Sequence, residues 1–214
     1  MSDRSLTPEL LMAAYAAGVF PMAETRDDPE VFWVDPRERG ILPLDGFRMS
    51  RSLARRMRRG DVRATLDEAF EQIIDGCADR EETWINGTIR GLMSQLFAMG
   101  HAHAFGVWRD DRLIGGMYGL ALGGAFFGES MFSAERDGSK MALAWAVDHL
   151  ARCGFVLFDT QSITPHLASM GAIEIPRARY RASLEQALDV PADIRRLPLE
   201  VDPQAVVQRI TQTS

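Results

Sequence analysis

Cysteine is scarce in this chain of 214 residues: there are two, Cys77 and Cys153, far apart in the sequence. Two such cysteines cannot build a disulfide framework, and they show no spacing typical of a zinc site. No apolar run approaches the roughly 20 residues that a membrane helix requires. The opening segment, MSDRSLTPEL, lacks the apolar core of a signal peptide. We therefore expect a reduced, cytoplasmic protein that does not bind a membrane.

Lysine is nearly absent as well, since Lys140 is the only one against 23 arginines. The arginines are unevenly spread. From Arg48 to Arg63 there are seven arginines and one acid, a local charge of +6, so the remainder of this chain of net charge −6 carries −12. An acidic body with one basic patch is typical of a protein that contacts a polyanion at one place and repels it elsewhere.

The basic patch lies on a predicted helix that runs from Ser50, a suitable N-cap, to Gly60, a suitable C-cap. Leu53 and Met57, four residues apart, mark its narrow apolar stripe. A different face carries only positive charge, from Arg51, Arg55, Arg58 and Arg59. An ordinary solvated face mixes both signs, whereas a row of guanidinium groups suits a phosphodiester backbone. We expect these four arginines to bind nucleic acid.

Glycine-rich phosphate loops are missing too. No Walker or Rossmann pattern is present, and AERDGSK, residues 134–140, is too poor in glycine for the pyrophosphate loop of an acyl-CoA enzyme.

Residues 101–132 nevertheless predict three successive antiparallel strands separated by an Asp-Asp and a Gly-Gly turn. An apolar helix over residues 139–153 then leads into the apolar run FVLF, which indicates a central strand that can lie parallel to a neighbour. A meander, a helix, a central strand and a further helix predict an α+β fold: an acetyltransferase-like (GNAT-like) mixed sheet with flanking helices. We expect the turn Asp35-Pro36-Arg37 to separate a small N-terminal subdomain, residues 1–36, from the main domain, residues 37–214. An acyltransferase-like pattern without a CoA loop requires another acyl donor.

The segment FDTQ holds the first candidate site. Asp159 ends a predicted buried strand and Gln161 follows two residues later, at the kind of strand end where open α/β sheets bind ligands. A carboxylate there can orient or deprotonate an amine, and an amide can position a proton. The alternative is a carboxylate that only caps the next turn. We expect both side chains in a loop beyond the strand and outside the core, so that replacing them costs little stability.

The segment FFGESMFS holds the second candidate. Glu129 stands in a predicted strand, so its side chain either faces solvent or is placed to bind a cation. Met117 and Met131 suit a pocket for a variable apolar side chain, although methionines in strands commonly belong to the core. Trp84, between two helices, either stacks on a base or closes the end of the core.

A series of segments from about Leu6 to Leu188 points to a known family. In order, they are YAAGVFP, FWVDPR, FRMSRSLARR, TWI, GHAHAFGVW, LIGGMYGLALGGAFFGESMFS, SKMAL, FDTQ, HLASMGA and EIPRARY. The series resembles the leucyl/phenylalanyl-tRNA–protein transferases, and GESMFS followed by SK and D-x-Q is specific in combination. The resemblance implies a soluble bacterial enzyme with a small N-terminal domain on an acetyltransferase-like domain. Such an enzyme moves Leu, Phe or Met from aminoacyl-tRNA onto the N-terminal Arg or Lys of a protein, and the product is an N-degron.

The resemblance also implies a role for each candidate residue. Asp159 and Gln161 match the catalytic pair, and Glu129 matches an acidic position near the acceptor. Tyr15 matches a residue of the N-terminal domain near the site, and the four arginines match the tRNA-binding cluster. The region that receives the donor's side chain and terminal adenosine is matched by Trp84, Met117, Phe126 and Met131.

We expect Asp159, acting through Gln161, to orient the acceptor amine as it attacks the aminoacyl ester. We expect no metal and no cofactor to be required, and a monomer. Two interpretations compete with this one. They are an acyl-CoA-dependent small-molecule N-acyltransferase and an RNA-binding module that has lost its activity.

Overall fold

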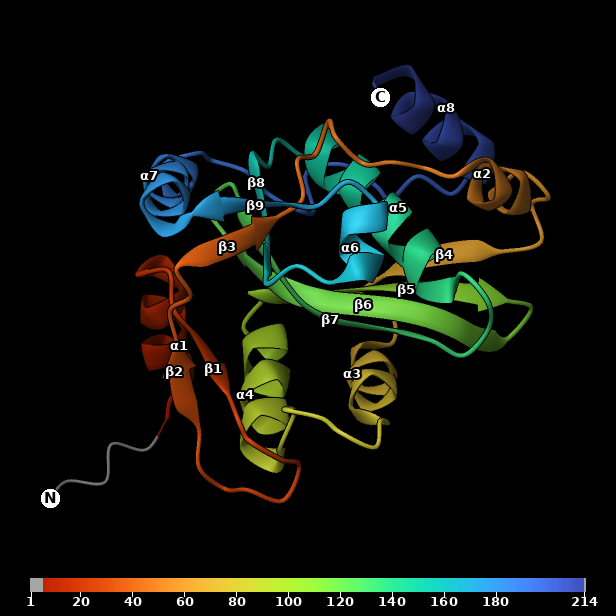
Figure 1. Cartoon of the computed structure of the whole chain (residues 1–214). Helices are drawn as coiled ribbons and strands as arrows, with labels where there is room; N and C mark the ends of the chain where they lie inside the picture. The colour runs from red at the N-terminus through yellow and green to blue at the C-terminus, as the bar shows by residue number, and fades with distance from the viewer. Residues whose placement is uncertain (1–5, 214) are drawn as a thin grey trace, which may run out of the picture.

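The centre of the molecule is a seven-stranded mixed sheet (Figure 1). The structure, a computed structural model, describes residues 6–213. The strands follow one another across the sheet as β4 (Arg63–Leu66), β5 (Ala102–Arg109), β6 (Arg112–Leu122), β7 (Ala125–Ser133), β8 (Leu157–Gln161), β3 (Glu38–Ile41) and β9 (Ile173–Pro176). Neighbouring strands are antiparallel except β7 and β8, which are parallel. The predicted α+β class is confirmed.

Strands β5, β6 and β7 form the antiparallel meander predicted for residues 101–132. Its two turns place Asp110 at φ 52° and Gly123 at φ 54°. Left-handed backbone is easy for glycine and tolerated by aspartate, so both turns suit their sequences. The FVLF segment enters the sheet as β8, parallel to β7, which confirms the prediction of a central strand.

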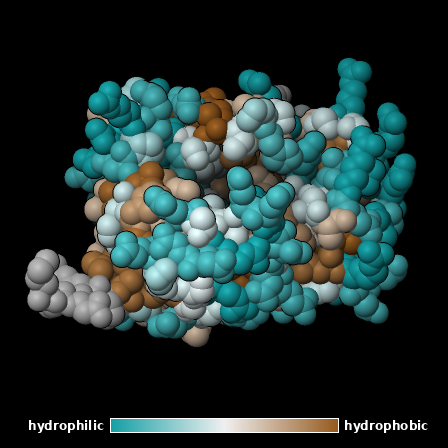
Figure 2. Space-filling view, turned by 60° about the horizontal axis from the view of Figure 1, so that its bottom comes forward, coloured by the Kyte–Doolittle hydropathy of each residue, from teal (hydrophilic) through white to brown (hydrophobic). Residues whose placement is uncertain are grey.

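Helices cover both faces of the sheet, and a hydrophobic cluster lies on each face. One cluster includes Trp145 and Leu150, and the other includes Ile74 and Leu96. The helices of the first face are α2 (Arg51–Met57), α5 (Gly138–Arg152), α6 (Pro165–Ser169) and α8 (Pro203–Thr213). The second cluster is formed by α1 (Pro8–Ala16), α3 (Phe70–Ala78), α4 (Gly87–Ala98) and α7 (Arg177–Leu188). Seen from the side of α3 and α4, the surface is mostly hydrophilic, with small separate hydrophobic patches (Figure 2).

Several elements have no counterpart in the sequence prediction. β1 (Phe20–Met22) and β2 (Phe32–Val34) form a separate two-stranded sheet. β3, with the sequence ERGI, lies in the sheet interior between β8 and β9. Four residues with two charges show no strand pattern, so only its pairing with both neighbours reveals this strand.

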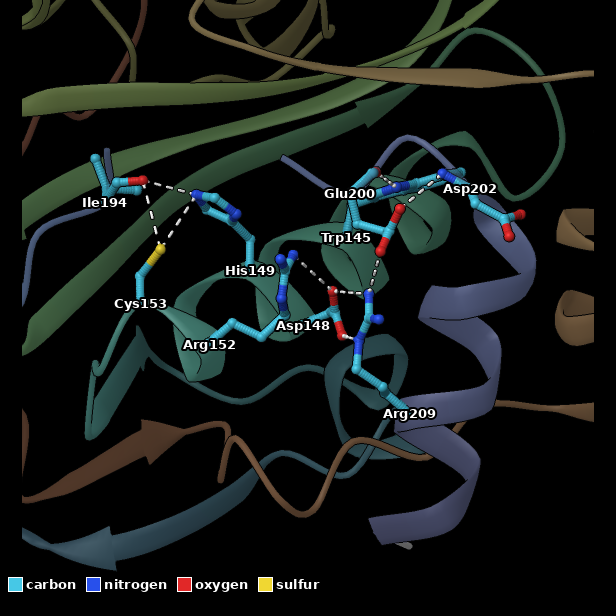
Figure 3. A network of polar contacts seen from close by, with 9 residues as sticks. All are labelled: Trp145, Asp148, His149, Arg152, Cys153, Ile194, Glu200, Asp202 and Arg209. Carbon is cyan, nitrogen blue, oxygen red and sulfur yellow. Dashed lines mark hydrogen bonds and ion pairs between the residues drawn. The ribbon is translucent and has the colours of Figure 1, made fainter. Parts of the chain in front are cut away.

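The chain after α7 forms a C-terminal clasp, residues 189–213, which crosses α5 and ends in α8 (Figure 3). His149 Nε2 of α5 donates to the Ile194 carbonyl at 2.7 Å, and Trp145 Nε1 donates to the Glu200 carbonyl at 2.9 Å. These bonds satisfy two buried ring nitrogens and fix the path of the segment.

An ion pair joins the end of the clasp to α5 (Figure 3). Arg209 of α8 donates to Asp148 through Nε at 2.6 Å and through Nη2 at 2.9 Å. Val206 and Val207 of α8 lie in the same hydrophobic cluster as Leu53 of α2. The clasp therefore holds α2 against the body of the protein. No helix within residues 6–213 combines the length and the apolar character that crossing a bilayer demands.

Candidate active site

A cavity of about 790 Å³ opens between β7, the end of β8, α6 and the segment that follows α3. Trp84, which is partly buried, contributes to its wall, as do Met131, Glu129 and Gln161. The structure therefore brings four of the predicted site residues to one place. The remaining lining residues are Phe20, Met22, Gly76, Asp79, Arg80, Ser130, Phe132, Ser133, Ala134, Ser139, Thr160, Ser162, Thr164, His166 and Leu167.

Glu129 reaches this cavity from a β-bulge. Tyr118 of β6 pairs with Ser130 and Gly119 pairs with Gly128, so Glu129 between them has no partner across the strands. A bulge redirects the side chain of its extra residue, and bulges are frequent beside active sites. Glu129 is 7% exposed, so the solvent-facing alternative considered for it is wrong.

The carboxylate of Glu129 is held at one oxygen and unpartnered at the other. Tyr15 Oη and Gln161 Nε2 both donate to its Oε1 at 2.7 Å, whereas its buried Oε2 has no hydrogen-bond partner among the described residues. Burial raises the pKa of Glu129 to about 7; the bonds from Tyr15 and Gln161 oppose the shift, and the negative charge of Asp159 adds to it. A buried carboxyl group of this kind can accept a proton near neutral pH.

Asp159 and Gln161 are both buried residues of β8, so the expectation that they lie in a loop beyond the strand was wrong. Asp159 lies deep in the core. It is a residue of β8, is 0% exposed and does not line the cavity. Arg39 donates to both carboxylate oxygens, through Nε at 2.9 Å and through Nη2 at 2.7 Å, and Tyr180 Oη donates at 2.6 Å. The carboxylate is thus fully engaged by buried partners.

Asp159 reaches the cavity only through the backbone of Gln161. The Gln161 N–H donates to Asp159 Oδ1 at 2.7 Å, and Gln161 has φ 64°. Left-handed backbone is strained for a residue with a Cβ, and this charge-assisted bond compensates the strain. Its effect is to turn the end of β8 so that the Gln161 side chain meets Glu129.

Arg39 and Tyr180 are the buried partners of the Asp159 carboxylate, and neither was predicted from the sequence. Arg39 is 1% exposed and lies between the rings of Phe20 and Tyr180, 4.6 and 4.5 Å from their centroids. The rule that a buried charge requires a partner would have predicted a cation for Asp159. Nothing local indicates which of the 23 arginines supplies it.

A small apolar annex of about 70 Å³ adjoins the large cavity. The residues that line both spaces are Glu129, Ser130, Met131, Thr160 and Leu167. The other walls of the annex are Met117, Gly128, Leu143 and Phe158. Met117 and Met131 therefore lie where a pocket for an apolar side chain was predicted.

Phe126 does not line the cavity or the annex. It is 0% exposed and packs edge-on against Phe105, Phe155 and Phe158. In β7 its side chain alternates with that of Phe127, which joins the opposite cluster. Phe126 thus supports the annex from behind, through Phe158.

The basic helix is α2, with Ser50 as its N-cap as predicted. Leu53 and Met57 are buried, and the predicted cationic face is exposed. That face consists of Arg51, Arg55, Arg58 and Arg59. None of these four forms an ion pair with another residue of 6–213, whereas Arg56 pairs with Asp137 at 3.4 Å. The helix ends at Met57 with Arg58 as its C-cap, not at Gly60 as predicted, so Arg58 and Arg59 directly follow α2. Together the four guanidinium groups form a concentrated patch of positive charge.

Comparison with known proteins now identifies the family. Residues 41–185 match the family model described as leucyl/phenylalanyl-tRNA protein transferase, and residues 4–37 match the model of its N-terminal domain. The chain belongs to this family.

Two curated leucyl/phenylalanyl-tRNA–protein transferases illustrate the relationship. The one from Ruegeria pomeroyi is 59% identical over 210 residues, covering 98% of this chain and 100% of the relative. One from Cereibacter sphaeroides is 58% identical over 214 residues, covering all of both chains. A solved structure of L-PGS from Bacillus licheniformis overlaps 73% of this chain and 58% of that chain, at 16% identity and a TM-score of 0.44. That similarity is too low to indicate a shared function.

Proposed function

We propose that this chain transfers Leu, Phe or Met from aminoacyl-tRNA to the N-terminal Arg or Lys of acceptor proteins and so marks them for N-degron-dependent degradation. The observation that carries the proposal is the apolar annex lined by Glu129, whose carboxylate is bonded to Gln161. Unbranched and γ-branched side chains fit a narrow pocket with methionine walls better than β-branched ones do. With the donor side chain in the annex, its ester carbonyl lies at the junction with the large cavity.

In the proposed reaction the α-amine of the acceptor attacks that carbonyl. A C–N bond forms, and the C–O bond to the tRNA ribose breaks. The amine proton passes to Glu129 Oε2, the unpartnered carboxylate oxygen, and then to the departing ribose oxygen. The Gln161 amide, bonded to Glu129 Oε1, orients the amine. The ester is already activated, so positioning of the two substrates supplies much of the acceleration.

Asp159 and Tyr15 act as positioning residues in this proposal. Asp159 is sealed from the cavity and shapes the Gln161 backbone, and Tyr15 holds Glu129 Oε1. Trp84 offers an aromatic face to the terminal adenosine of the donor. The four exposed arginines in and directly after α2 bind the phosphates of the tRNA. The proposal needs no metal and no cofactor.

The remaining features of the proposal concern the whole chain. We assign it an acetyltransferase-like (GNAT-like) fold, with an N-terminal subdomain over residues 1–36 and a catalytic domain over residues 37–214. We propose that it works in the cytoplasm as a monomer.

A transfer assay tests the proposed function. Labelled Leu-tRNA is offered with peptides that begin with Arg, Lys or Ala, and we expect product from the first two only. Leu-, Phe- and Met-tRNA serve as donors, whereas Ile- and Val-tRNA are disfavoured by ~1–3 kcal/mol per methylene-sized mismatch. Efficient transfer from Ile- or Val-tRNA would overturn the assignment of the annex. Transfer from acyl-CoA in place of aminoacyl-tRNA would support the small-molecule acyltransferase instead.

A further inference from the structure

Two of the described residues that line the large cavity carry carboxylates. One of these side chains is buried and the other is exposed to solvent. Glu129 is 7% exposed, whereas Asp79 directly follows α3 and is exposed. No ion pair or side-chain hydrogen bond within residues 6–213 engages the Asp79 carboxylate. The cavity therefore has one buried carboxylate with a single unpartnered oxygen, Glu129 Oε2, and one exposed carboxylate, that of Asp79.

The position of the annex indicates which of the two carboxylates lies beside the reacting atoms. Glu129 lines both the annex and the large cavity, whereas Asp79 lines only the large cavity. A donor side chain in the annex places the ester carbonyl, and hence the attacking α-amine, beside Glu129. The cationic side chain of an N-terminal Arg or Lys extends several bonds away from that amine. It requires a second carboxylate, farther from the annex.

The surroundings of Asp79 suit a guanidinium or ammonium group. An exposed carboxylate lets the cation keep part of its hydration, which avoids the large cost of burying a charge. The carbonyl end of a helix also favours cations, and α3 has no basic residue in its last turn. Met22 and Trp84 line the same cavity and offer apolar surface to the methylene groups of the side chain.

Two arginines near Asp79 are already engaged. Arg26 Nη2 donates to the carbonyls of Ala78 at 2.8 Å and Arg80 at 2.7 Å, which fixes the chain on both sides of Asp79. The guanidinium of Arg80 donates to the Met131 carbonyl of β7. The backbone on both sides of Asp79 is thus fixed, and within residues 6–213 its carboxylate forms no ion pair with either arginine.

We propose that Asp79 determines acceptor specificity by forming an ion pair with the cationic side chain of the acceptor's N-terminal residue. This inference rests on the proposed function. It separates the two tasks in the cavity: Glu129 serves the α-amine, and Asp79 recognises the side chain.

The test compares Asp79→Asn with the wild type on two acceptor peptides. One begins with Arg and the other with citrulline, which has the same shape and no charge. With saturating Leu-tRNA, we expect the variant to lose about tenfold in kcat/KM on the Arg peptide, chiefly through KM, as a lost charge-assisted bond predicts. On the citrulline peptide it should match the wild type. Glu82→Gln, which removes an exposed acid three residues away that does not line the cavity, is the matched control and should change neither value.

An unchanged ratio of Arg to citrulline activity in Asp79→Asn overturns the inference, as does an equal loss in Glu82→Gln, which would indicate a long-range charge effect. Both results leave the proposed function intact, because the wild type still transfers Leu to the Arg peptide. A wild type that transfers nothing from Leu-tRNA to the Arg peptide overturns both.

Discussion

At the scale of single residues, Glu129 lines the cavity with a buried carboxyl group, and ionisation of that group lowers the stability of the protein. Its folded pKa of about 7 lies above the 4.5 of an unfolded glutamate. Between these pH values the folded chain keeps a proton that the unfolded chain has lost. Raising the pH through this window therefore lowers the free energy of unfolding, by on the order of 3 kcal/mol in total.

We expect Glu129→Gln to remove this pH dependence. The glutamine Oε1 still accepts from Tyr15 and Gln161, but no charge forms. Below pH 4.5 the variant and the wild type should be about equally stable, and the variant should gain progressively up to pH 7 and above. Chemical denaturation between pH 4 and pH 8.5 measures the difference, with the exposed Glu185→Gln as control. A stability difference that is the same at pH 5 and pH 8 would contradict the burial argument.

Asp159 gives a second prediction for a single residue, and its buried setting reverses the expectation that replacing it costs little stability. Asp159→Ala leaves the guanidinium of Arg39 buried without its anion, which costs about 3–5 kcal/mol. For a chain of this size that corresponds to a fall of roughly 10 °C in melting temperature. Gln161→Ala removes one buried hydrogen bond to Glu129 and leaves no guanidinium unpaired, so its melting temperature should fall much less. Thermal melts of the two variants check this, and equal melting temperatures would argue against the buried pair.

At the scale of elements, α2 depends on its neighbours. A helix of seven residues with unpaired like charges is too short to be stable alone, since isolated helices shorter than ~12 residues are marginal in water. Its buried residues Leu53 and Met57 belong to the cluster that includes α5 and α8. Packing thus presents the arginines on a rigid support.

We expect Arg55→Ala combined with Arg59→Ala to raise KM for aminoacyl-tRNA and to leave the kinetics with an aminoacyl-adenosine donor unchanged. Both side chains are exposed and make no ion pair within residues 6–213, so their removal should not unfold the helix. Arg112→Ala, at an exposed arginine of β6 that pairs with Glu135 and lies outside the basic patch, serves as the control. Equal losses with both donors would show that the helix contributes to structure and not to tRNA binding.

At the scale of the whole molecule, the charge distribution predicts a strong salt dependence. The net charge is −6, although the stretch from Arg48 to Arg63 carries +6. Because the remainder of the surface repels RNA, binding should depend on the patch alone. If four arginines each neutralise one phosphate, the logarithm of the tRNA affinity falls with the logarithm of salt concentration with a slope of about −3 to −4.

Measurements of KM for aminoacyl-tRNA over a series of salt concentrations test this slope. The KM for the aminoacyl-adenosine donor, which lacks the phosphate backbone, should hardly depend on salt concentration. Similar slopes for both donors would mean that salt acts on the fold and not on the contact with RNA.

Local patterns of the sequence determined much of this molecule. The meander, the apolar α5, the central strand β8 and the capped basic helix each follow from the period, caps or charge of neighbouring residues. The basic face of α2 could be predicted from sequence spacing for the same reason, since residues three and four apart share a helix face. Met117 and Met131 line the annex, and Met117 also belongs to a core cluster, so both interpretations offered by residue type describe part of its setting.

Only the tertiary structure determined which side chains of the site contact one another. Tyr15 bonds to Glu129 across 114 positions of sequence, and Arg39 reaches Asp159 across 120. Strand β3, which carries Arg39, has no strand pattern and exists because β8 and β9 supply its hydrogen bonds. A buried charge shows that a partner is needed, but the partner is chosen by the packing of distant segments, which leaves no periodic trace in the chain. For that reason the sequence alone made Asp159 a candidate, whereas only the fold shows that it is buried and paired with Arg39.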